Sequence, residues 1–180
     1  MAAQNETLEV NVGHQAPDFI ARDLDGNPIS VKALVAGRKA LLLFYRGGWC
    51  PFCNKQLAAI SQDNSKFKEL DVAIVAVSSE EVEKGKELLK KLSLPFTLLS
   101  DTTFAGIDRY GVRDPSPSEK VRSLGVTQLS KPAAFVIDRE GIVRYKDVGK
   151  NASDRPKNED LLGALAEADR TMEPAATSTV

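Results

Sequence analysis

Apolar residues in the first half of the chain form continuous runs, separated by a stretch with helical spacing. The runs at 39–45 and 72–77 suit strands that are buried on both faces of a sheet. Between them, Pro51 suits a first helical position, and apolar residues then recur at helical spacing as far as Leu70. Ahead of these elements we expect a short strand at 18–21, a turn at 25–28 and a returning strand at 29–31.

The second half continues this alternation and then changes to a hairpin. Ser78 and Glu81 have the spacing of a capping box, which predicts a helix from there to about Lys91. Asp101 is expected to cap a further helix that runs through Tyr110. The other expected elements are a strand at 94–99, a loop at 113–120, a hairpin of 133–138 with 142–146, and a helix at 158–170.

This order of elements predicts an α/β fold with one domain. Alternating strands and helices followed by a late hairpin imply a mixed central β-sheet flanked by helices. We expect the domain to span residues 13–170, after an N-terminal arm at 1–12 and before a flexible C-terminal tail at 171–180. A chain of 180 residues is long enough to bury a core without disulfide staples.

The charge balance excludes some partners but indicates no function. Twenty-four Lys and Arg against 25 Asp and Glu leave a net charge of −1, which favours neither nucleic acid nor an anionic membrane as a partner. The first residues lack the basic and apolar segments of a secretory signal, and the longest apolar run is far too short to span a bilayer. We therefore expect a cytoplasmic protein.

Two cysteines three residues apart, Cys50 and Cys53, are the candidate catalytic residues. A disulfide across so short a loop would stabilise the fold by only about 2 kcal/mol, so redox chemistry explains the pair better. Cys50 stands where the helix begins, and the unpaired N–H groups there favour a thiolate over a thiol. Cys53 lies one turn further on and deeper, within reach of a disulfide. We therefore expect Cys50 to be the nucleophile and Cys53 to resolve the intermediate.

The residues around the cysteines are expected to support the site. Arg46 adds positive charge, and Gly47 and Gly48 turn the chain between strand and helix. Trp49 shields the sulfurs, docks a partner or is ordinary packing, and Pro51 starts the helix.

No metal or other cofactor is expected at this site. A zinc site needs about four ligands, and the two cysteines together with the single histidine, His14, do not complete one in a monomer.

A family resemblance is carried by the segments VGHQAPDF, RGGWCPFC, LLSDTTFAGIDRYGV and PAAFVIDREGIVRY. From about Val12 to about Leu165 the chain resembles the peroxiredoxin-like branch of the alkyl hydroperoxide reductase/thiol-specific antioxidant family. The resemblance implies a thioredoxin-like fold with an N-terminal strand extension, peroxide as the substrate class, and Cys50 as the peroxidatic residue.

The chain departs from that family's pattern near the cysteines. Ordinary peroxiredoxins have a Pro seven residues and a Thr or Ser three residues before the peroxidatic Cys, where this chain has Leu43 and Gly47. They also hold the peroxide with a later Arg, near the position of Lys131 and Pro132 here, and this chain has no distant third Cys. Pro132 instead resembles the cis-proline beside the disulfide of thioredoxins, so we expect it to be cis and to line the site.

Three functions are compatible with these residues. The first is a thiol peroxidase that reduces hydrogen peroxide or organic hydroperoxides and is recycled by a thiol reductant such as thioredoxin or glutathione. The second is a thioredoxin- or glutaredoxin-like dithiol–disulfide oxidoreductase, which the Cys-Pro-Phe-Cys sequence and Pro132 favour. The third is a non-enzymatic redox-sensing module whose disulfide alters a binding surface. The extent of the resemblance favours the first, and the sequence leaves both a monomer and a dimer open.

Overall fold

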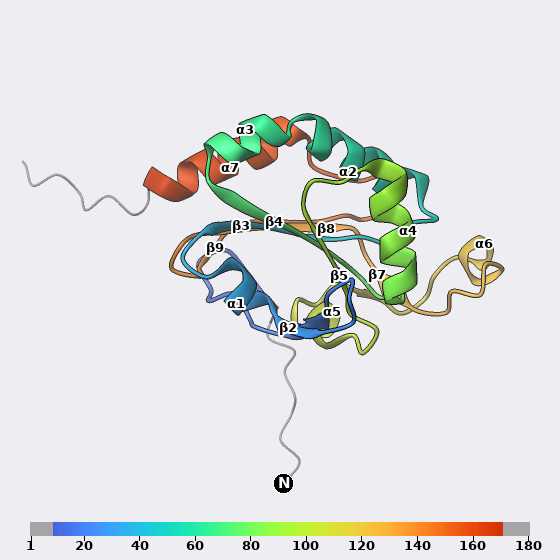
Figure 1. Cartoon of the computed structure of the whole chain (residues 1–180). Helices are drawn as coiled ribbons and strands as arrows, with labels where there is room; N and C mark the ends of the chain where they lie inside the picture. Colours follow the sequence, from blue (N-terminus) through green and yellow to red (C-terminus); the bar gives the residue numbers. More distant parts are fainter. Residues whose placement is uncertain (1–8, 171–180) are drawn as a thin grey trace, which may run out of the picture.

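A computed structural model describes residues 9–170, and in this range a mixed sheet lies between two layers of helices (Figure 1). The strands are β1 (Ile20–Arg22), β2 (Pro28–Ser30), β3 (Lys39–Phe44), β4 (Val72–Ser78), β5 (Thr97–Ser100), β6 (Arg113–Asp114), β7 (Leu129–Ser130), β8 (Ala133–Ile137) and β9 (Val143–Val148). The helices are α1 (Val31–Val35), α2 (Pro51–Gln62), α3 (Asn64–Glu69), α4 (Val82–Leu92), α5 (Ala105–Arg109), α6 (Glu119–Arg122) and α7 (Asn158–Arg170).

The main sheet has the strand order β2-β1-β5-β4-β3-β8-β9. Strands β3, β4 and β5 run parallel to one another, while β8 pairs antiparallel with β3, and β9 antiparallel with β8. Helices α2, α3, α4 and α7 lie on one side of the sheet, and α1 and α5 lie on the other (Figure 1). This is the mixed α/β architecture that the order of the elements predicts.

The core is divided by the sheet because alternate residues of a strand point to opposite faces. All six residues of β3 are buried. Leu41 and Leu43 pack with α2, α4 and α7, whereas Leu42 and Phe44 pack with α1 and α5 on the other face. Strand β3 is therefore the centre of the fold, and the first of these two cores extends to the cysteines.

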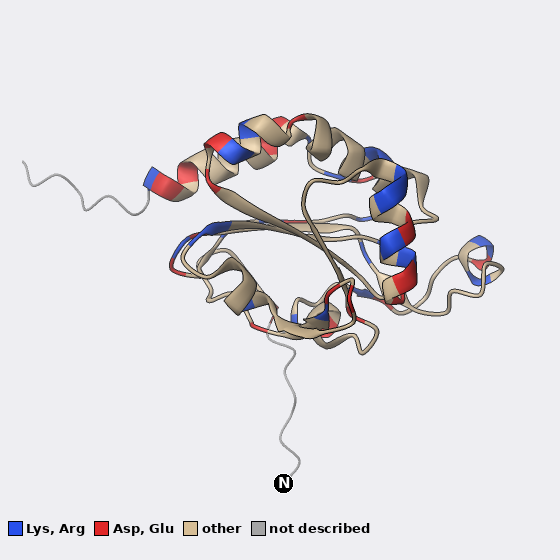
Figure 2. Ribbon diagram, in the orientation of Figure 1, with Lys and Arg blue, Asp and Glu red and all other residues tan. Residues whose placement is uncertain are grey.

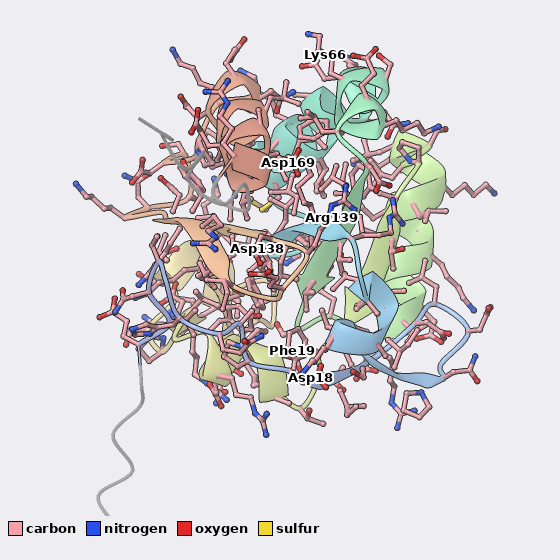
Figure 3. All side chains as sticks on the ribbon, turned by 90° about the vertical axis from the view of Figure 1, so that its left-hand side faces the viewer. Asp18, Phe19, Lys66, Asp138, Arg139 and Asp169 are labelled. Carbon is pink, nitrogen blue, oxygen red and sulfur yellow. The ribbon has the colours of Figure 1, made fainter. Side chains whose placement is uncertain are left out.

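One charged side chain also lies inside the molecule, at the start of β3. Lys39 is 1% exposed, and its Nζ donates to the carbonyl of Leu165 at 3.2 Å and pairs with the carboxylate of Asp169. Asp169 belongs to the last turn of α7 (Figure 3). The buried ammonium thus joins the end of α7 to the central strand.

Helix α4 has an acidic residue at its N-terminus and basic residues at its C-terminus, as the helix dipole favours. Glu83 lies in its first turn, and Lys90 and Lys91 lie in its last turn (Figure 2). Within residues 9–170, the helices are all too short or too polar to cross a membrane.

Several elements follow the prediction closely. Strand β3 and helix α7 occupy the expected ranges, and β8 and β9 form the expected hairpin. The turn of that hairpin is held by the buried carboxylate of Asp138, which accepts the N–H groups of Glu140 and Ile142 at 2.9 Å each (Figure 3).

Other predictions about elements are wrong. The predicted capping box does not form, because Ser78 is the last residue of β4 and is paired with Ser100 of β5. Helix α4 begins only at Val82, after Glu81. The single helix expected from Pro51 is interrupted at Asp63 and continues as α3. The strand expected at 94–99 begins at Thr97, and the short helices α1 and α6 and strands β6 and β7 were not predicted.

The packed part of the chain begins before residue 13. Val10 is 3% exposed and belongs to the core that also contains Phe44, and Glu9 forms an ion pair with Lys146 of β9 at 2.6 Å. The remainder of the expected arm and the expected tail, residues 1–8 and 171–180, lie outside the described residues.

Candidate active site

The two cysteines lie where the central strands end. Beyond β3, the N–H of Tyr45 still pairs with the carbonyl of Val77 at the end of β4 (3.0 Å). The chain then passes from Arg46 to Trp49 and enters α2. The carboxyl ends of parallel strands meet at one edge of a sheet, which is where α/β proteins place their ligand sites.

The two glycines of this connection have different roles. Gly47 has a φ of +153°, and a Cβ on it would lie 2.3 Å from Nε1 of Trp49, so this position needs glycine. A Cβ on Gly48 would meet only ordinary contacts at 3.6 Å or more. The N–H of Gly48 donates to a carboxylate oxygen of Glu80 at 2.8 Å, which fixes the loop.

Cys50 occupies the N-cap position of α2, directly before Pro51 in the first turn, and its side chain makes no capping hydrogen bond. Interaction with the thiol and backbone N–H of Cys53 is the main cause that lowers the pKa of Cys50 to about 5. Burial of the 0% exposed residue opposes this shift, whereas the guanidinium of Arg46, with Nη1 3.8 Å from the sulfur, contributes to it. The lowered pKa favours the anionic form of the Cys50 sulfur at neutral pH.

Cys53, in the first turn of α2, is also 0% exposed. Its pKa is raised, first because its thiol donates to Cys50 and second because it is buried. Its sulfur accepts the backbone N–H of Arg46 at 3.4 Å and Nη2 of Arg155 at 3.0 Å. The two pKa shifts thus favour an ionised Cys50 beside a protonated Cys53, and an arginine contacts each sulfur.

Trp49 contacts Arg46 of the site and also lines a hollow in the structure. The guanidinium of Arg46 lies over its indole ring, 5.1 Å from the ring centre. Trp49 also helps to line a hollow of about 270 Å³ together with Glu80 and Leu88. The indole Nε1 is buried without a hydrogen-bond partner within the described range. The stacking keeps the Arg46 side chain close to Cys50.

Pro132 lies at the same end of the sheet but is not a cis-proline. All peptide bonds of the described residues are trans, so the cis expectation is wrong. The backbone on both sides of Pro132 is fixed, because the N–H of Lys131 donates to Val112 (2.7 Å) and the Pro132 carbonyl accepts from Gly149 (2.8 Å). Ala133 then pairs with Phe44, the last residue of β3.

Two further residues of the site were not found from the sequence. Glu80 lies two residues after β4, and Arg46 lies two residues after β3. Because β3 and β4 pair in parallel, a prediction of that pairing would have placed Glu80 beside Arg46. Burial raises the pKa of Glu80. Arg155 is separated from Cys53 by 102 residues and stands in a polar segment, where the sequence carries no corresponding signal.

A metal centre is not formed by the part of the chain that the structure describes. Residues 9–170 contain no group of three or more His, Cys, Asp and Glu side chains arranged to hold a metal ion.

The sequence of this chain is similar to those of known proteins. The sequence profile of the AhpC/TSA family matches residues 12–146. Chloroplastic peroxiredoxin Q of Oryza sativa subsp. japonica is 33% identical over 137 residues, which are 76% of this chain and 58% of the relative. The thiol-disulfide oxidoreductase ResA of Bacillus cereus is 28% identical over 148 residues, covering 82% of this chain and 75% of that protein.

The fold has counterparts among solved structures as well. The crystal structure of peroxidoxin BcpB from Mycobacterium tuberculosis superposes with a TM-score of 0.74 at 23% identity, covering 92% of this chain and all of that one. By contrast, the chain spans 58% of the length of the curated peroxiredoxin Q proteins of rice and wheat that it matches. The structural likeness establishes a thioredoxin-like fold.

Proposed function

Since the chain belongs to the AhpC/TSA family, we propose that it is a thiol-dependent peroxidase that works through Cys50 and Cys53. The observation that carries the proposal is the state of the two sulfurs. Cys50 is ionised at the start of α2, and Cys53 directs its protonated thiol at the Cys50 sulfur. This pair provides a nucleophile and a resolving thiol at one helix N-terminus.

The proposed first step is an attack of the Cys50 thiolate on one oxygen of the peroxide. The O–O bond breaks, Cys50 keeps one oxygen as a sulfenic acid, and the other oxygen leaves and takes up a proton. The guanidinium of Arg46, which contacts the Cys50 sulfur, is placed to stabilise the negative charge that moves to the leaving oxygen.

In the second step, Cys53 loses its proton and attacks the sulfenic sulfur. The S–S bond forms, the S–O bond breaks, and hydroxide leaves with a proton as water. A thiol reductant such as thioredoxin or glutathione then supplies two electrons and two protons, which restore both thiols. We place this cycle in the cytoplasm.

The burial of Cys50 supports a small substrate. The residue is 0% exposed, so a protein disulfide cannot reach its sulfur without a local opening of the loop or of α2. Hydrogen peroxide has only two heavy atoms and needs a much smaller opening. Burial therefore favours the peroxidase over a protein disulfide reductase.

The second candidate function is a dithiol–disulfide oxidoreductase. It is favoured by the two-residue spacing of the cysteines at a helix start and by the similarity to ResA, whose name describes that activity. In this reaction Cys50 would form a mixed disulfide with the substrate, and Cys53 would release it.

The test compares the wild type with Cys50→Ser and Cys53→Ser in both reactions. We expect hydrogen peroxide to oxidise the wild type far faster than it oxidises a free thiol, as followed by Trp49 fluorescence. Cys50→Ser should abolish this step, while Cys53→Ser should retain it at a reduced rate, because the Cys50 pKa rises, and should accumulate the sulfenic acid, seen by dimedone labelling and mass spectrometry.

Two results would contradict the proposal. Oxidation of Cys50 no faster than that of a free thiol would exclude a peroxidase, and rapid reduction of insulin or of a glutathione mixed disulfide would then favour the oxidoreductase. Failure of both reactions, with a partner bound in only one redox state, would favour the redox-sensing module.

A further inference from the structure

Arg155 contacts the resolving cysteine from a part of the chain far away in sequence. It lies between β9 and α7, and its Nη2 is 3.0 Å from Sγ of Cys53. Cys50 has its own arginine contact, from Arg46. Neither the Cys-Pro-Phe-Cys segment nor the residues that carry the family resemblance include Arg155.

The guanidinium of Arg155 is held in place on two further sides. Its Nε donates to the carbonyl of Ala152 at 3.0 Å, and its Nη1 donates to the side chain of Gln56 on α2. The segment that carries it is itself fixed by Asn151, whose side-chain oxygen accepts the N–H of Asp154 at 3.0 Å. This arginine is therefore directed at Cys53 by its surroundings.

We propose that Arg155 is a positioning residue that holds Cys53 as a thiolate, aimed at Cys50, during the resolving step. The inference rests on the proposed function and adds the group that makes its second step feasible. In the resolving step, the Cys53 proton leaves, the Cys53–Cys50 S–S bond forms, and the S–O bond of the sulfenic acid breaks to release water.

The need for such a group follows from the charges at the site. In the reduced protein the single negative charge is on Cys50, and this charge together with burial keeps Cys53 protonated. When Cys50 becomes a sulfenic acid it is neutral, so it no longer opposes ionisation of Cys53. Burial still does, and the adjacent guanidinium of Arg155 compensates for it.

The other groups that face Cys53 do not carry a compensating charge. From the loop before α2, Arg46 reaches the Cys53 sulfur with its backbone N–H, while its guanidinium lies near Cys50. From the end of β3, Tyr45 faces Cys53 with a pKa that burial raises, so it stays neutral. Among these contacts, the guanidinium of Arg155 is the cation in direct contact with the Cys53 sulfur.

The first experiment measures Cys53 alone, in a Cys50→Ser background. Alkylation by iodoacetamide as a function of pH gives the pKa of Cys53, and we expect Arg155→Met to raise it by about one to two units. Arg155→Lys should restore part of the shift, because it returns the charge. Lys157→Met, which removes a charge from the same loop at an exposed position, should leave the profile unchanged.

The second experiment follows one turnover in the chain with both cysteines. We expect Arg155→Met to leave the rate of Cys50 oxidation by hydrogen peroxide unchanged and to slow disulfide formation at least tenfold at pH 7. Raising the pH should recover the rate of the second step in Arg155→Met, which loss of structure would not produce.

The outcomes separate this inference from the proposed function. An unchanged Cys53 pKa in Arg155→Met, or equal shifts in Arg155→Met and Lys157→Met, would overturn the role of Arg155. If peroxide fails to oxidise Cys50 while the Cys53 pKa shifts as expected, the peroxidase proposal fails and the positioning of Cys53 by Arg155 stands.

Discussion

At the scale of single residues, the sequence predicts the reactive cysteines better than it predicts the residues that surround them in the fold. Cys50, Cys53 and Arg46 were predicted together because they are neighbours in the chain at a strand-to-helix transition. Glu80 and Arg155 were not, because they reach the site through the pairing of β3 with β4 and through the segment after β9. Contacts of this kind depend on tertiary packing, and a local pattern does not encode them.

The two glycines before the cysteines give a matched pair of substitutions. Gly47→Ala should destabilise the reduced protein by about 2 kcal/mol or more, because the residue has a positive φ and its Cβ would overlap the Trp49 indole. Gly48→Ala should cost less than about 1 kcal/mol, since its Cβ meets ordinary contacts and its N–H still reaches Glu80.

Urea unfolding of both variants under reducing conditions measures this difference. The alkylation rate of Cys50 should also fall at pH 7 only in Gly47→Ala, where the displaced Trp49 takes Arg46 with it. Equal losses of stability in the two variants would show that the loop adapts and that Gly47 is not required.

At the scale of elements, the sequence predicts those whose pattern is local and long. Strand β3 is a continuous apolar run and helix α7 has a clear helical period, and both were placed within a residue. The predicted capping box at Ser78 was wrong because sheet pairing with Ser100 extends β4 through that serine. Short elements such as α1 and α6 carry too few residues to establish a period.

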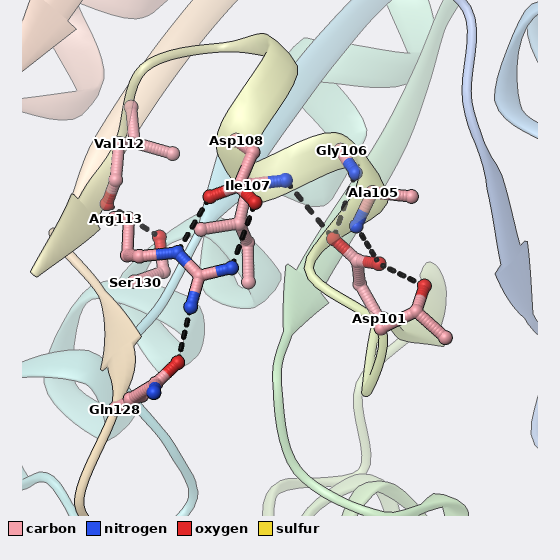
Figure 4. A network of polar contacts seen from close by, with 10 residues as sticks. Asp101, Ala105, Gly106, Ile107, Asp108, Val112, Arg113, Gln128 and Ser130 are labelled. Carbon is pink, nitrogen blue, oxygen red and sulfur yellow. Dashed lines mark hydrogen bonds and ion pairs between the residues drawn. The ribbon is translucent and has the colours of Figure 1, made fainter.

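Asp101 shows how one side chain can start an element. Its buried carboxylate accepts the N–H groups of Ala105, Gly106 and Ile107, each at 2.9 Å, and so begins α5 (Figure 4). Asp101 therefore accepts the first helix N–H groups as expected of a cap, but the N-cap position itself is Phe104 and α5 begins at Ala105. Asp101 stands four positions before the helix because Phe104 adopts a left-handed conformation between them.

We expect Asp101→Ala to destabilise the protein by about 2–4 kcal/mol, because three helix N–H groups lose their acceptor and two of the three residues that donate them are buried. Asp108→Ala in the same network is the control. It removes an ion pair to Arg113 in which the Asp108 side chain is 51% exposed, so its cost should stay below about 1 kcal/mol. Urea midpoints of the two variants would refute this assignment if they coincided.

At the scale of the whole molecule, the order of elements was sufficient to predict the architecture. Early alternation of strands and helices gives parallel pairing of β3, β4 and β5, and the late hairpin adds β8 and β9 in the antiparallel sense. What the order could not predict is that the segment after β9 reaches a sulfur at the start of α2, and that Glu80, two residues after β4, holds the loop before that helix. These contacts link the stability of the fold to the redox state of the site.

The ionised Cys50 makes this link dependent on pH. Its pKa in the folded, reduced protein is about 5, against about 8.5 for an ordinary thiol in an unfolded chain. A group whose pKa is lowered on folding contributes stability that is complete above its unfolded pKa and is lost as the pH falls to its folded pKa. The pKa of Cys53 is raised, so it stays protonated in the folded protein and opposes this increase only where the pH approaches the unfolded pKa of about 8.5.

We therefore expect the free energy of unfolding of the reduced protein, relative to that of the Cys50–Cys53 disulfide form, to increase between pH 5 and pH 8.5. The increase should approach about 1.4 kcal/mol per pH unit, because the disulfide form has no thiol to titrate and all other groups are common to both forms. Urea unfolding of the two forms at pH 5.5, 6.5 and 7.5 measures the difference. In Cys53→Ser, which removes the main cause of the low Cys50 pKa, the slope of the reduced form should fall. If the curves for the reduced and disulfide forms ran parallel across this range, Cys50 would have an ordinary pKa in the fold, and the nucleophile on which the peroxidase depends would be absent at neutral pH.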